Sequence, residues 1–337
     1  MGTQLVITGV GMATPVGLTT PASVAALRAG IAAFEEVEGI LGSRGEPLIG
    51  AALPDGGGGE WTQDRLRPLA VAVCREALAA IPRGRRQRLT LRALVPESQR
   101  PGAAFRDPAF WRSVAAEANP DGSAAAMVIE GGNAAGAAAL AALRGKLDGT
   151  ALLVGFDTLL SLPALAYVER GFRLKGPDQP RGLIPGEACI AIVVEPAASV
   201  PPDAVFCRVD GVATADEPVP LASDDPCLGT GLTTAIRGAM QDAGWSSEQV
   251  TKVYCDLNGE VYRAHEWMLA LCRTLGSPEV VHPADCVGDV GSASVPLLIG
   301  MIAVAWRRGF ASWDRVLVFA SSDFGLRGAV CLARPTR

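Results

Sequence analysis

Histidine and paired cysteines are scarce in this chain. Two histidines occur among 337 residues, and the eight cysteines are scattered without a C-x-x-C pair. Zinc sites draw on clusters of these residue types at short spacings, so we expect neither a bound metal nor another cofactor. Aromatic residues make up only 5% and the net charge is −5, which argues against nucleic acid as a partner.

Long hydrophobic runs are missing as well. The longest, Val295–Trp306, is too short to span a membrane and is followed by two arginines, so we interpret it as a buried core helix. The chain opens on the strand-like segment Leu5–Thr8 without the pattern of a signal peptide. Scattered cysteines inside apolar segments fit a reducing compartment. We therefore expect a cytoplasmic protein without a membrane span.

Small and apolar residues dominate what is present. Hydrophobic residues make up 49% of the chain, charged residues 19%, and glycine occurs 39 times. This composition predicts a sizeable core of closely packed helices and strands, and it excludes general disorder. The length suffices for two ordinary domains or for one large duplicated α/β unit.

The opening of the chain returns after a proline-rich joint. Residues 5–15 and residues 205–214 each read as a strand that breaks at glycines. Each is followed later by an amphipathic helix, predicted at residues 65–80 and at residues 232–243. We therefore predict two related α/β halves, residues 1–198 and residues 199–337.

A second echo lies further along each half. A helix of small residues ends at Arg144 in the first half, and a helix ends at Arg308 in the second. Ten residues separate Arg144 from Val154 at the end of the next strand, and ten separate Arg308 from Val318. Two halves in the same order predict two similar sheets around shared small-residue helices.

The segment Met127–Leu143 carries the clearest candidate site. It combines a short apolar strand, two glycines and a helix of small residues whose first turn holds Asn133. A strand-to-helix turn places a side chain at a helix N-terminus, where free N–H groups and the helix dipole favour a thiolate or an oxyanion. Here an amide occupies that position, and an amide is not a nucleophile.

Four motifs resemble those of the β-ketoacyl synthase branch of the thiolase superfamily. Residues 6–17 resemble the family's N-terminal strand and turn, and residues 181–187 (RGLIPGE) resemble its DGFVPGEGA stretch. Residues 291–293 before a helix resemble its GHTLGAAGA element, and residues 322–325 (SDFG) resemble its final SFGFGG turn. These matches span nearly the whole chain in the family's order.

The resemblance implies a thiolase-like five-layered αβαβα fold built from two duplicated α/β halves. It also implies a two-fold dimer, either a homodimer or a heterodimer with a related synthase, with Met127–Glu130 near the two-fold axis. Synthases of this family load the acyl group on a cysteine at the strand-to-helix turn. Two histidines from the C-terminal half support decarboxylation and stabilise the enolate.

The catalytic residues implied by the resemblance do not carry over. The cysteine position falls on Asn133, the first histidine falls on or beside Asp256, and the second falls on Gly288. No cysteine lies between Cys74 and Cys189, so shifting the alignment by one residue restores no nucleophile. We interpret these three positions as a vestigial catalytic triad.

Five further residues are expected to border this vestigial site. Cys255 and Cys286 lie close in sequence to the lost histidine positions, but no histidine stands nearby to activate either thiol, so burial as small apolar residues is the simpler interpretation. Asn258 belongs to a polar cluster that could bind a polar ligand, although capping of the next helix is the interpretation we favour. Phe324 and Gly325 belong to the final turn.

A basic loop ahead of a predicted strand at residues 89–95 offers a candidate docking surface. It contains Arg83, Arg85, Arg86 and Arg88. A solvated turn is the simpler interpretation of this loop. The alternative is a docking patch for an acidic partner such as acyl carrier protein.

The leading functional hypothesis is a catalytically inactive β-ketoacyl-synthase homologue, a pseudoenzyme with a structural or partner-binding role. One alternative is a chain-length-factor-like partner of acyl chains or acyl carrier protein in fatty acid or polyketide synthesis. Others are a true β-ketoacyl synthase or decarboxylase, and an accessory protein of a bacterial secretion or effector system. An open tunnel reaching Asn133 would favour acyl binding, whereas side chains filling that space would favour a scaffold.

Overall fold

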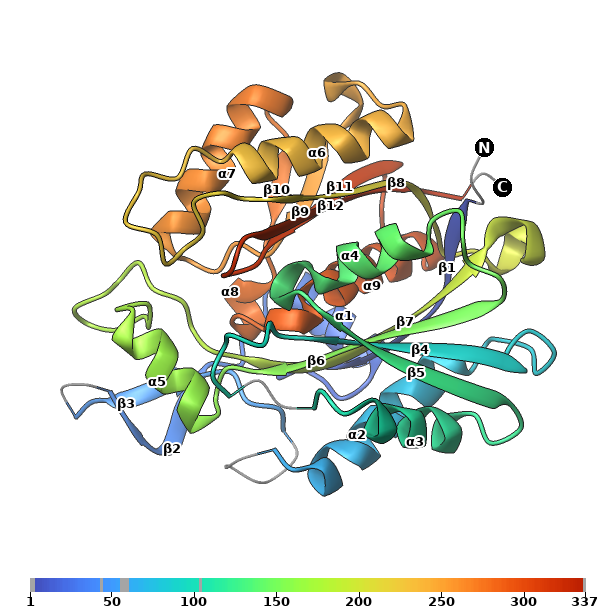
Figure 1. Cartoon of the computed structure of the whole chain (residues 1–337), viewed down its shortest axis with the longest axis horizontal. Helices are drawn as coiled ribbons and strands as arrows, with labels where there is room; N and C mark the ends of the chain where they lie inside the picture. Colours follow the sequence, from blue (N-terminus) through green and yellow to red (C-terminus); the bar gives the residue numbers. More distant parts are fainter. Residues whose placement is uncertain (1–3, 43–44, 55–60, 103–104, 336–337) are drawn as a thin grey trace.

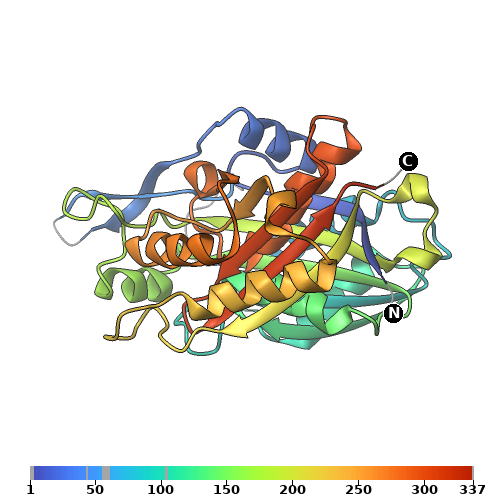
Figure 2. The ribbon, with the colours of Figure 1, turned by 90° about the horizontal axis from the view of Figure 1, so that it is seen from above.

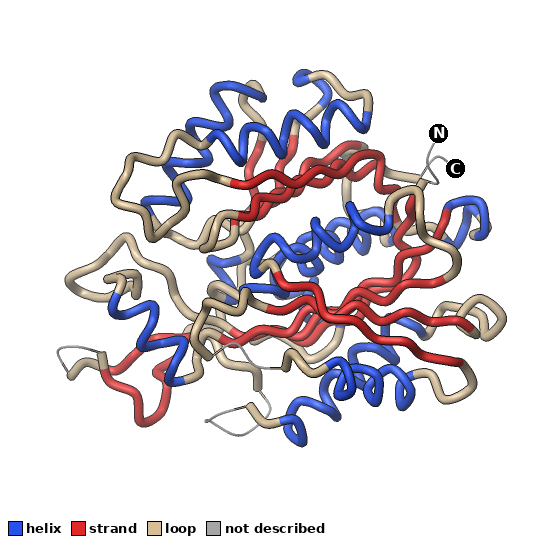
Figure 3. Tube along the Cα trace, viewed as in Figure 1, coloured by secondary structure: helices blue, strands red, loops and turns tan. Residues whose placement is uncertain are grey.

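Five layers of secondary structure stack in the order helices, sheet, helices, sheet, helices (Figures 1 and 3). The computed structural model describes residues 4–42, 45–54, 61–102 and 105–335. The strands are β1 (Leu5–Ala13), β2 (Glu35–Leu41), β3 (Pro47–Gly50), β4 (Arg88–Val95), β5 (Ser123–Glu130), β6 (Thr150–Thr158), β7 (Glu187–Pro196), β8 (Cys207–Asp216), β9 (Lys252–Cys255), β10 (Glu279–Val281), β11 (Arg315–Ser321) and β12 (Leu326–Ala333). The α-helices are α1 (Thr20–Arg28), α2 (Gln63–Leu78), α3 (Pro108–Ala118), α4 (Ala135–Leu143), α5 (Leu162–Arg170), α6 (Thr230–Ala243), α7 (Val261–Thr274), α8 (Ala284–Val287) and α9 (Ser294–Arg307).

The two sheet layers have the same strand order. The first half runs β5-β4-β6-β7-β1 and the second runs β10-β9-β11-β12-β8. In each layer three strands pair in parallel and two more are added in antiparallel fashion. A short antiparallel pairing of Leu5–Ile7 in β1 with Cys207–Val209 in β8 joins the layers along one edge. The predicted duplicated αβαβα fold is thereby confirmed.

Glycines in the opening strand of each half allow an outer helix to pack closely. A Cβ atom on Gly9 of β1 would lie 2.0 Å from the carbonyl oxygen of Ala77 in α2. A Cβ atom on Gly211 of β8 would lie 2.1 Å from the carbonyl oxygen of Ala239 in α6. Because any side chain at either position would collide with helix backbone, both halves require glycine at the equivalent place.

The middle layer holds α4 and α9 side by side between the two sheets (Figures 1 and 2). Small residues permit this, since a Cβ atom on Gly136 of α4 would lie 2.7 Å from the Cβ atom of Val295 in α9. Nearly every residue of α9 is buried in the largest hydrophobic cluster, so the predicted core helix at Val295–Trp306 is confirmed.

Helices α2 and α3 cover the outer face of the first sheet, and α6 and α7 cover that of the second (Figure 1). Of the helices in the described residues, none combines the length and the apolar content that crossing a membrane requires. The predicted division between residues 198 and 199 falls in the connection from β7 to β8 and remains a proposal.

Candidate functional site

Asn133 lies where the sequence places it, at the turn between β5 and α4. It is the central residue of a short 3-10 turn, Gly132–Ala134, that leads into α4, and it is 7% exposed. Gly132 has a φ of +51°, and a Cβ atom there would lie 2.4 Å from a carboxylate oxygen of Glu97. The positive φ favours glycine at that position, and any side chain there would also require the Glu97 carboxylate to move.

The Asn133 amide is held by the second half of the chain. Its Nδ2 lies 3.2 Å from Oδ1 of Asp289 and 3.4 Å from Oγ of Ser294. The same Asp289 oxygen accepts a hydrogen bond from the backbone N–H of Gly291 at 2.9 Å. The two strand-to-helix turns of the halves therefore meet at this point, and Asn133 donates across the junction.

Asn258 extends this contact toward α7. Its Nδ2 donates to Oδ2 of Asp289 at 2.6 Å and to Oε2 of Glu260 at 2.8 Å. Its Oδ1 accepts from the backbone N–H of Glu260 at 3.1 Å. Glu260 is the N-cap residue of α7, but no side-chain capping bond is formed there. The favoured capping interpretation of this cluster is therefore wrong, because the Glu260 carboxylate is drawn to arginine side chains instead.

Two arginines and three carboxylates form what we call the charge cluster: Arg173, Arg263, Asp256, Glu260 and Asp323. Arg173 lies 2.6 Å from Glu260 and 2.7 Å from Asp323. Arg263 lies 2.8 Å from Asp256, 3.1 Å from Asp323 and 3.3 Å from Glu260. The side chains of all five are at most 12% exposed. Losing Arg263 would leave Asp256 without a cation, and losing either arginine would leave three buried carboxylates with a single cation, which is costly.

Burial and the two guanidinium groups set the protonation of this cluster. Burial raises the pKa of Asp256 to about 6, although Arg263 opposes the shift. Burial also acts on Asp323, but Arg173 and Arg263 outweigh it and hold the pKa of Asp323 below its usual value. Burial opposes the charge of Arg173 too, yet Asp323 and Glu260 raise its pKa. Both arginines therefore stay charged, and the pKa of Asp256 lies closer to neutral pH than that of Asp323.

A small cavity lies beside this network. Cys255, Asp256, Gly288, Asp289 and Ser294 line it together with apolar residues of α8 and α9. The volume within which the centre of a water molecule fits is about 10 Å³. That volume holds roughly one water and is far smaller than a pocket for an organic ligand.

The two cysteines expected near the site are buried. Cys255 lies 3.8 Å from the carbonyl oxygen of Val281, and burial raises its pKa well above the ordinary value of a thiol. Burial likewise raises the pKa of Cys286 in α8. His265 is exposed on α7, and Nδ1 of His282 lies 2.9 Å from Asp285. Because burial raises their pKa, the thiols of Cys255 and Cys286 favour the unreactive protonated form.

Gly288 lines the cavity but cannot carry a side chain. Its φ is +69°, and a Cβ atom would lie 2.7 Å from the carbonyl oxygen of Ile184. The side chain that faces Asn133 from this segment belongs to Asp289, the next residue. A lone Asp ahead of the Gly-Ser-Ala turn was the signal in the sequence that could have identified it.

Phe324 and Gly325 form the tip of the β11–β12 hairpin, next to Asp323. The ring of Phe324 stacks on that of Tyr167 in α5 with centroids 6.2 Å apart. The guanidinium carbon of Arg173 lies 5.7 Å from the centroid of Tyr167. Gly325 adopts a φ of +117°, which the hairpin requires. The rings of Phe324 and Tyr167 thus lie beside Arg173, at the edge of the charge cluster.

The basic loop lies at the other end of the sheet from Asn133. It precedes β4, whereas Asn133 follows β5, and the two strands are parallel and about 23 Å long. Arg85 is drawn inward to buried Glu195 at 3.0 Å, and exposed Arg83 pairs with Asp121 at 3.3 Å. Arg86 is half-buried and Arg88 is exposed, so the loop presents fewer free cations than its sequence suggests.

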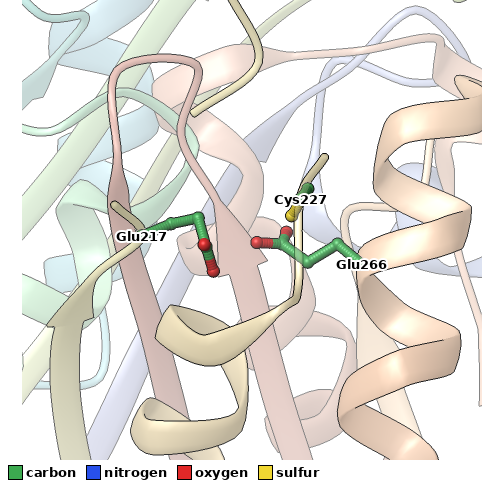
Figure 4. Close-up of side chains that lie close together, drawn as sticks. All are labelled: Glu217, Cys227 and Glu266. Carbon is green, nitrogen blue, oxygen red and sulfur yellow. The ribbon is translucent and has the colours of Figure 1, made fainter. Parts of the chain in front are cut away.

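A second buried group of polar side chains, Glu217, Cys227 and Glu266, lies at the start of α6 (Figure 4). Glu217 accepts the backbone N–H of Gly231 at 2.7 Å. Glu266 lies 2.6 Å from Nε of Arg327 and accepts from Ser321 at 2.7 Å. The buried guanidinium of Arg327 already places a positive charge beside this group, so a metal ion is not needed to balance its carboxylates.

The main site residues missed from the sequence come from four separate segments. They are Arg173, Arg263, Asp289, Ser294 and Asp323. For Arg263 the signal in the sequence was a charge on the inner face of an amphipathic helix. That signal indicates a buried pair without naming its partners.

No protein-family model and no curated protein matches this sequence. Solved structures do share its architecture. The PfaC keto synthase-chain length factor superposes with a TM-score of 0.76 at 13% identity, over 100% of this chain and 43% of that one. The chain therefore spans less than half the length of that protein.

Two further structures match over comparable lengths. The oxazolomycin ketosynthase domain OzmH KS7 of Streptomyces albus JA3453 has a TM-score of 0.78 at 14% identity, covering 99% of this chain and 75% of that one. A β-ketoacyl synthase from Burkholderia phymatum STM815 has a TM-score of 0.74 at 17% identity, covering 99% and 100%. The chain thus has the thiolase-like fold of ketosynthases and of ketosynthase/chain length factor proteins.

Proposed function

We propose that this chain is a ketosynthase-like protein without condensing activity that serves as a structural or partner-binding subunit. One observation carries the proposal: the Asn133 amide is fixed to Asp289 and Ser294 at the position that the resemblance assigns to a reactive cysteine. An amide held in this way offers no nucleophile, and Asp289 brings a carboxylate where an enolate would develop negative charge.

The surroundings of Asn133 support the same conclusion. Condensation needs room for an acyl chain and imidazole groups to activate a thiol. The cavity beside the site holds about one water molecule, and Asp256 of the charge cluster, paired with Arg263, forms part of its lining. His265 is exposed on α7, and Nδ1 of His282 at the end of β10 lies 2.9 Å from a carboxylate oxygen of Asp285 rather than beside a thiol.

The test is acyl loading. The purified protein is incubated with acetyl- and malonyl-pantetheine thioesters, and intact-mass spectrometry records any adduct together with released carbon dioxide. We expect neither product. The variant Asn133→Cys should also stay unloaded, because Asp289 disfavours a thiolate beside it. An adduct at an identified residue of the unaltered chain, such as Cys255, would contradict the proposal.

A partner-binding role draws support from the edge strand β5. It pairs with β4 on one side only, and its outward residues include Met127, whose side chain is 41% exposed. An unpaired strand edge of eight residues is suited to pairing with the same edge of a second subunit. We place the dimer interface here, with Met127–Glu130 near its two-fold axis.

A chain-length-factor-like role is the second candidate. The ishigamide ketosynthase/chain length factor covers 99% of this chain at a TM-score of 0.74, and it supports a paired subunit of this kind. Another structural neighbour is a type II polyketide synthase ketosynthase in complex with its acyl carrier protein. Stable heterodimer formation with an active ketosynthase encoded beside this chain would favour the second candidate, and a homodimer in its presence would favour the first.

A further inference from the structure

A hollow lined by arginine and aromatic side chains lies far from Asn133, at the C-terminal end of α9. Its larger part, about 560 Å³, is lined by Val10, Phe206, Val304, Arg307 and Arg308 among others. A neighbouring hollow of about 380 Å³ shares Phe206 and Arg307 and extends to Arg334. We call this continuous surface the basic groove.

Three arginines on or beside the basic groove carry charges that no carboxylate of the described residues neutralises. The guanidinium carbon of Arg28 lies 4.0 Å from the centroid of the exposed ring of Phe310. Arg308, two residues before Phe310 in the sequence, is also exposed. Arg307 lies over Phe206 at 5.3 Å and donates to the carbonyl oxygen of Asp203 at 2.7 Å.

Two carboxylate residues line the basic groove, Glu76 in the larger hollow and Asp203 in the smaller one, so the three arginines leave it with a net positive charge. Glu76 is already bound to the backbone N–H groups of Met12 and Thr20. Arginine and aromatic residues are the types most enriched at protein interfaces. The basic groove is therefore built for an acidic partner with apolar side chains.

The ribbon of β2 and β3 has the opposite character. Glu35, Glu36 and Glu38 are exposed on β2, and within the described residues none of them forms an ion pair. Leu41 on the same strand is 63% exposed, and Ile49 on β3 is 38% exposed. The ribbon therefore presents three carboxylates together with two exposed aliphatic side chains.

We propose that the β2–β3 ribbon of one copy of this chain docks in the basic groove of a second copy. The three carboxylates of the ribbon meet the guanidinium groups of Arg28, Arg307 and Arg308, and the exposed Leu41 packs against the aromatic side of the groove. Charge complementarity sets the pairing, and the apolar contacts add to its stability.

The ribbon and the C-terminal side of the groove lie at opposite ends of the molecule. The ribbon projects to the left in Figure 1, whereas the groove reaches Arg334 beside the C-terminus at the right. Contact between different patches on successive copies is head-to-tail, so it extends a chain of copies unless rotation closes a ring. This association uses neither β5 nor Asn133, so it stands or falls independently of the proposed function.

A charge swap tests the pairing. Sedimentation velocity at 50 mM salt should show assemblies larger than a dimer, and 500 mM salt should weaken them roughly tenfold or more. The ribbon variant Glu35→Arg/Glu36→Arg/Glu38→Arg and the groove variant Arg28→Glu/Arg308→Glu should each abolish them. An equimolar mixture of the two variants should restore assembly, because each then offers the charge that the other lacks.

Two controls make the result decisive. Substituting Arg83→Glu and Arg88→Glu in the basic loop removes as much positive charge elsewhere and should leave assembly unchanged. A labelled peptide with the sequence of residues 34–42 should bind the unaltered chain and not the groove variant. The proposal is overturned if the unaltered chain never exceeds a dimer, even where the peptide or another acidic protein binds, or if the mixture fails to reassemble.

Discussion

The turns that precede α4 and α9 have the same backbone and different chemistry. Each begins at a glycine with a φ of +51°, Gly132 in the first half and Gly291 in the second, and each continues as a 3-10 turn into a small-residue helix. Each glycine also faces a carboxylate, Glu97 in one case and Asp157 in the other. Duplication has kept what the backbone requires, while the side chains have diverged.

The two carboxylates differ in how firmly they are fixed. Asp157 is 3% exposed, pairs with buried Arg100 and accepts two hydrogen bonds from Ser292. Glu97 is only half-buried, and burial raises its pKa. The second turn is therefore anchored from several sides, whereas the turn that carries Asn133 has a neighbour that can move.

The glycine turns give the largest expected difference. Gly291→Ala should lower the free energy of unfolding by roughly 3 kcal/mol, because strain at positive φ adds to a collision with fixed Asp157. Gly132→Ala should cost only about 1–2 kcal/mol, since Glu97 can swing away and leave the φ strain alone. Urea unfolding of both variants measures this. Equal losses would show that the two carboxylates are equally rigid.

The free edges of the two sheets offer the second comparison. β5 is eight residues long and β10 is three, so the first half presents the better surface for another chain. Met127→Lys would place two like charges near a two-fold axis and should weaken dimerisation roughly 30-fold, about 2 kcal/mol. Met268→Lys on exposed α7 is the matched control and should have no effect. Analytical ultracentrifugation over a dilution series distinguishes the outcomes.

The smallest expected effect is a pH dependence within the charge cluster. The pKa of Asp256 is raised to about 6 in the folded state, so its neutral form stabilises the fold below about pH 4, and that contribution fades as pH rises through 6. Asp256→Asn should match the unaltered chain near pH 4 and exceed its stability at pH 7.5 by on the order of 1 kcal/mol.

Asp323→Asn should behave in the opposite way. Its pKa is lowered in the folded state, so ionised Asp323 contributes stability at neutral pH that is lost in acid. The cost of this substitution should therefore shrink as pH falls. Urea unfolding at pH 4, 6 and 7.5 tests both variants, and parallel pH curves for the two would contradict the assigned protonation.

Periodicity and glycine placement made the elements predictable. The predicted strand at residues 89–95 is β4, and the predicted helices at residues 65–80 and 232–243 are α2 and α6 within two residues at each end. These elements are long, and their apolar residues recur with one period, so local sequence determines them. The duplication was readable for the same reason, since each half repeats its own spacing.

The site was predictable only where it follows the chain locally. Asn133 could be placed because strand, glycines and helix are contiguous. Its partner Asp289 is 156 residues away, and Arg173 reaches Glu260 across 87 residues. No local pattern encodes which charges pair over such separations, which is why capping seemed the simpler role for the Asn258 segment.

The sequence by itself determined the two repeated α/β halves and the amide at the turn before α4, because short-range periodicity and backbone requirements specify them. The order of strands within each sheet came from the tertiary structure. The tertiary structure alone decided what surrounds that amide. Folding brings the two turns together and buries Arg173 and Arg263 among carboxylates from distant segments. Buried charges need partners, and here the partners come from segments that are distant in the sequence. Only the packed molecule therefore shows how the space beside Asn133 is filled.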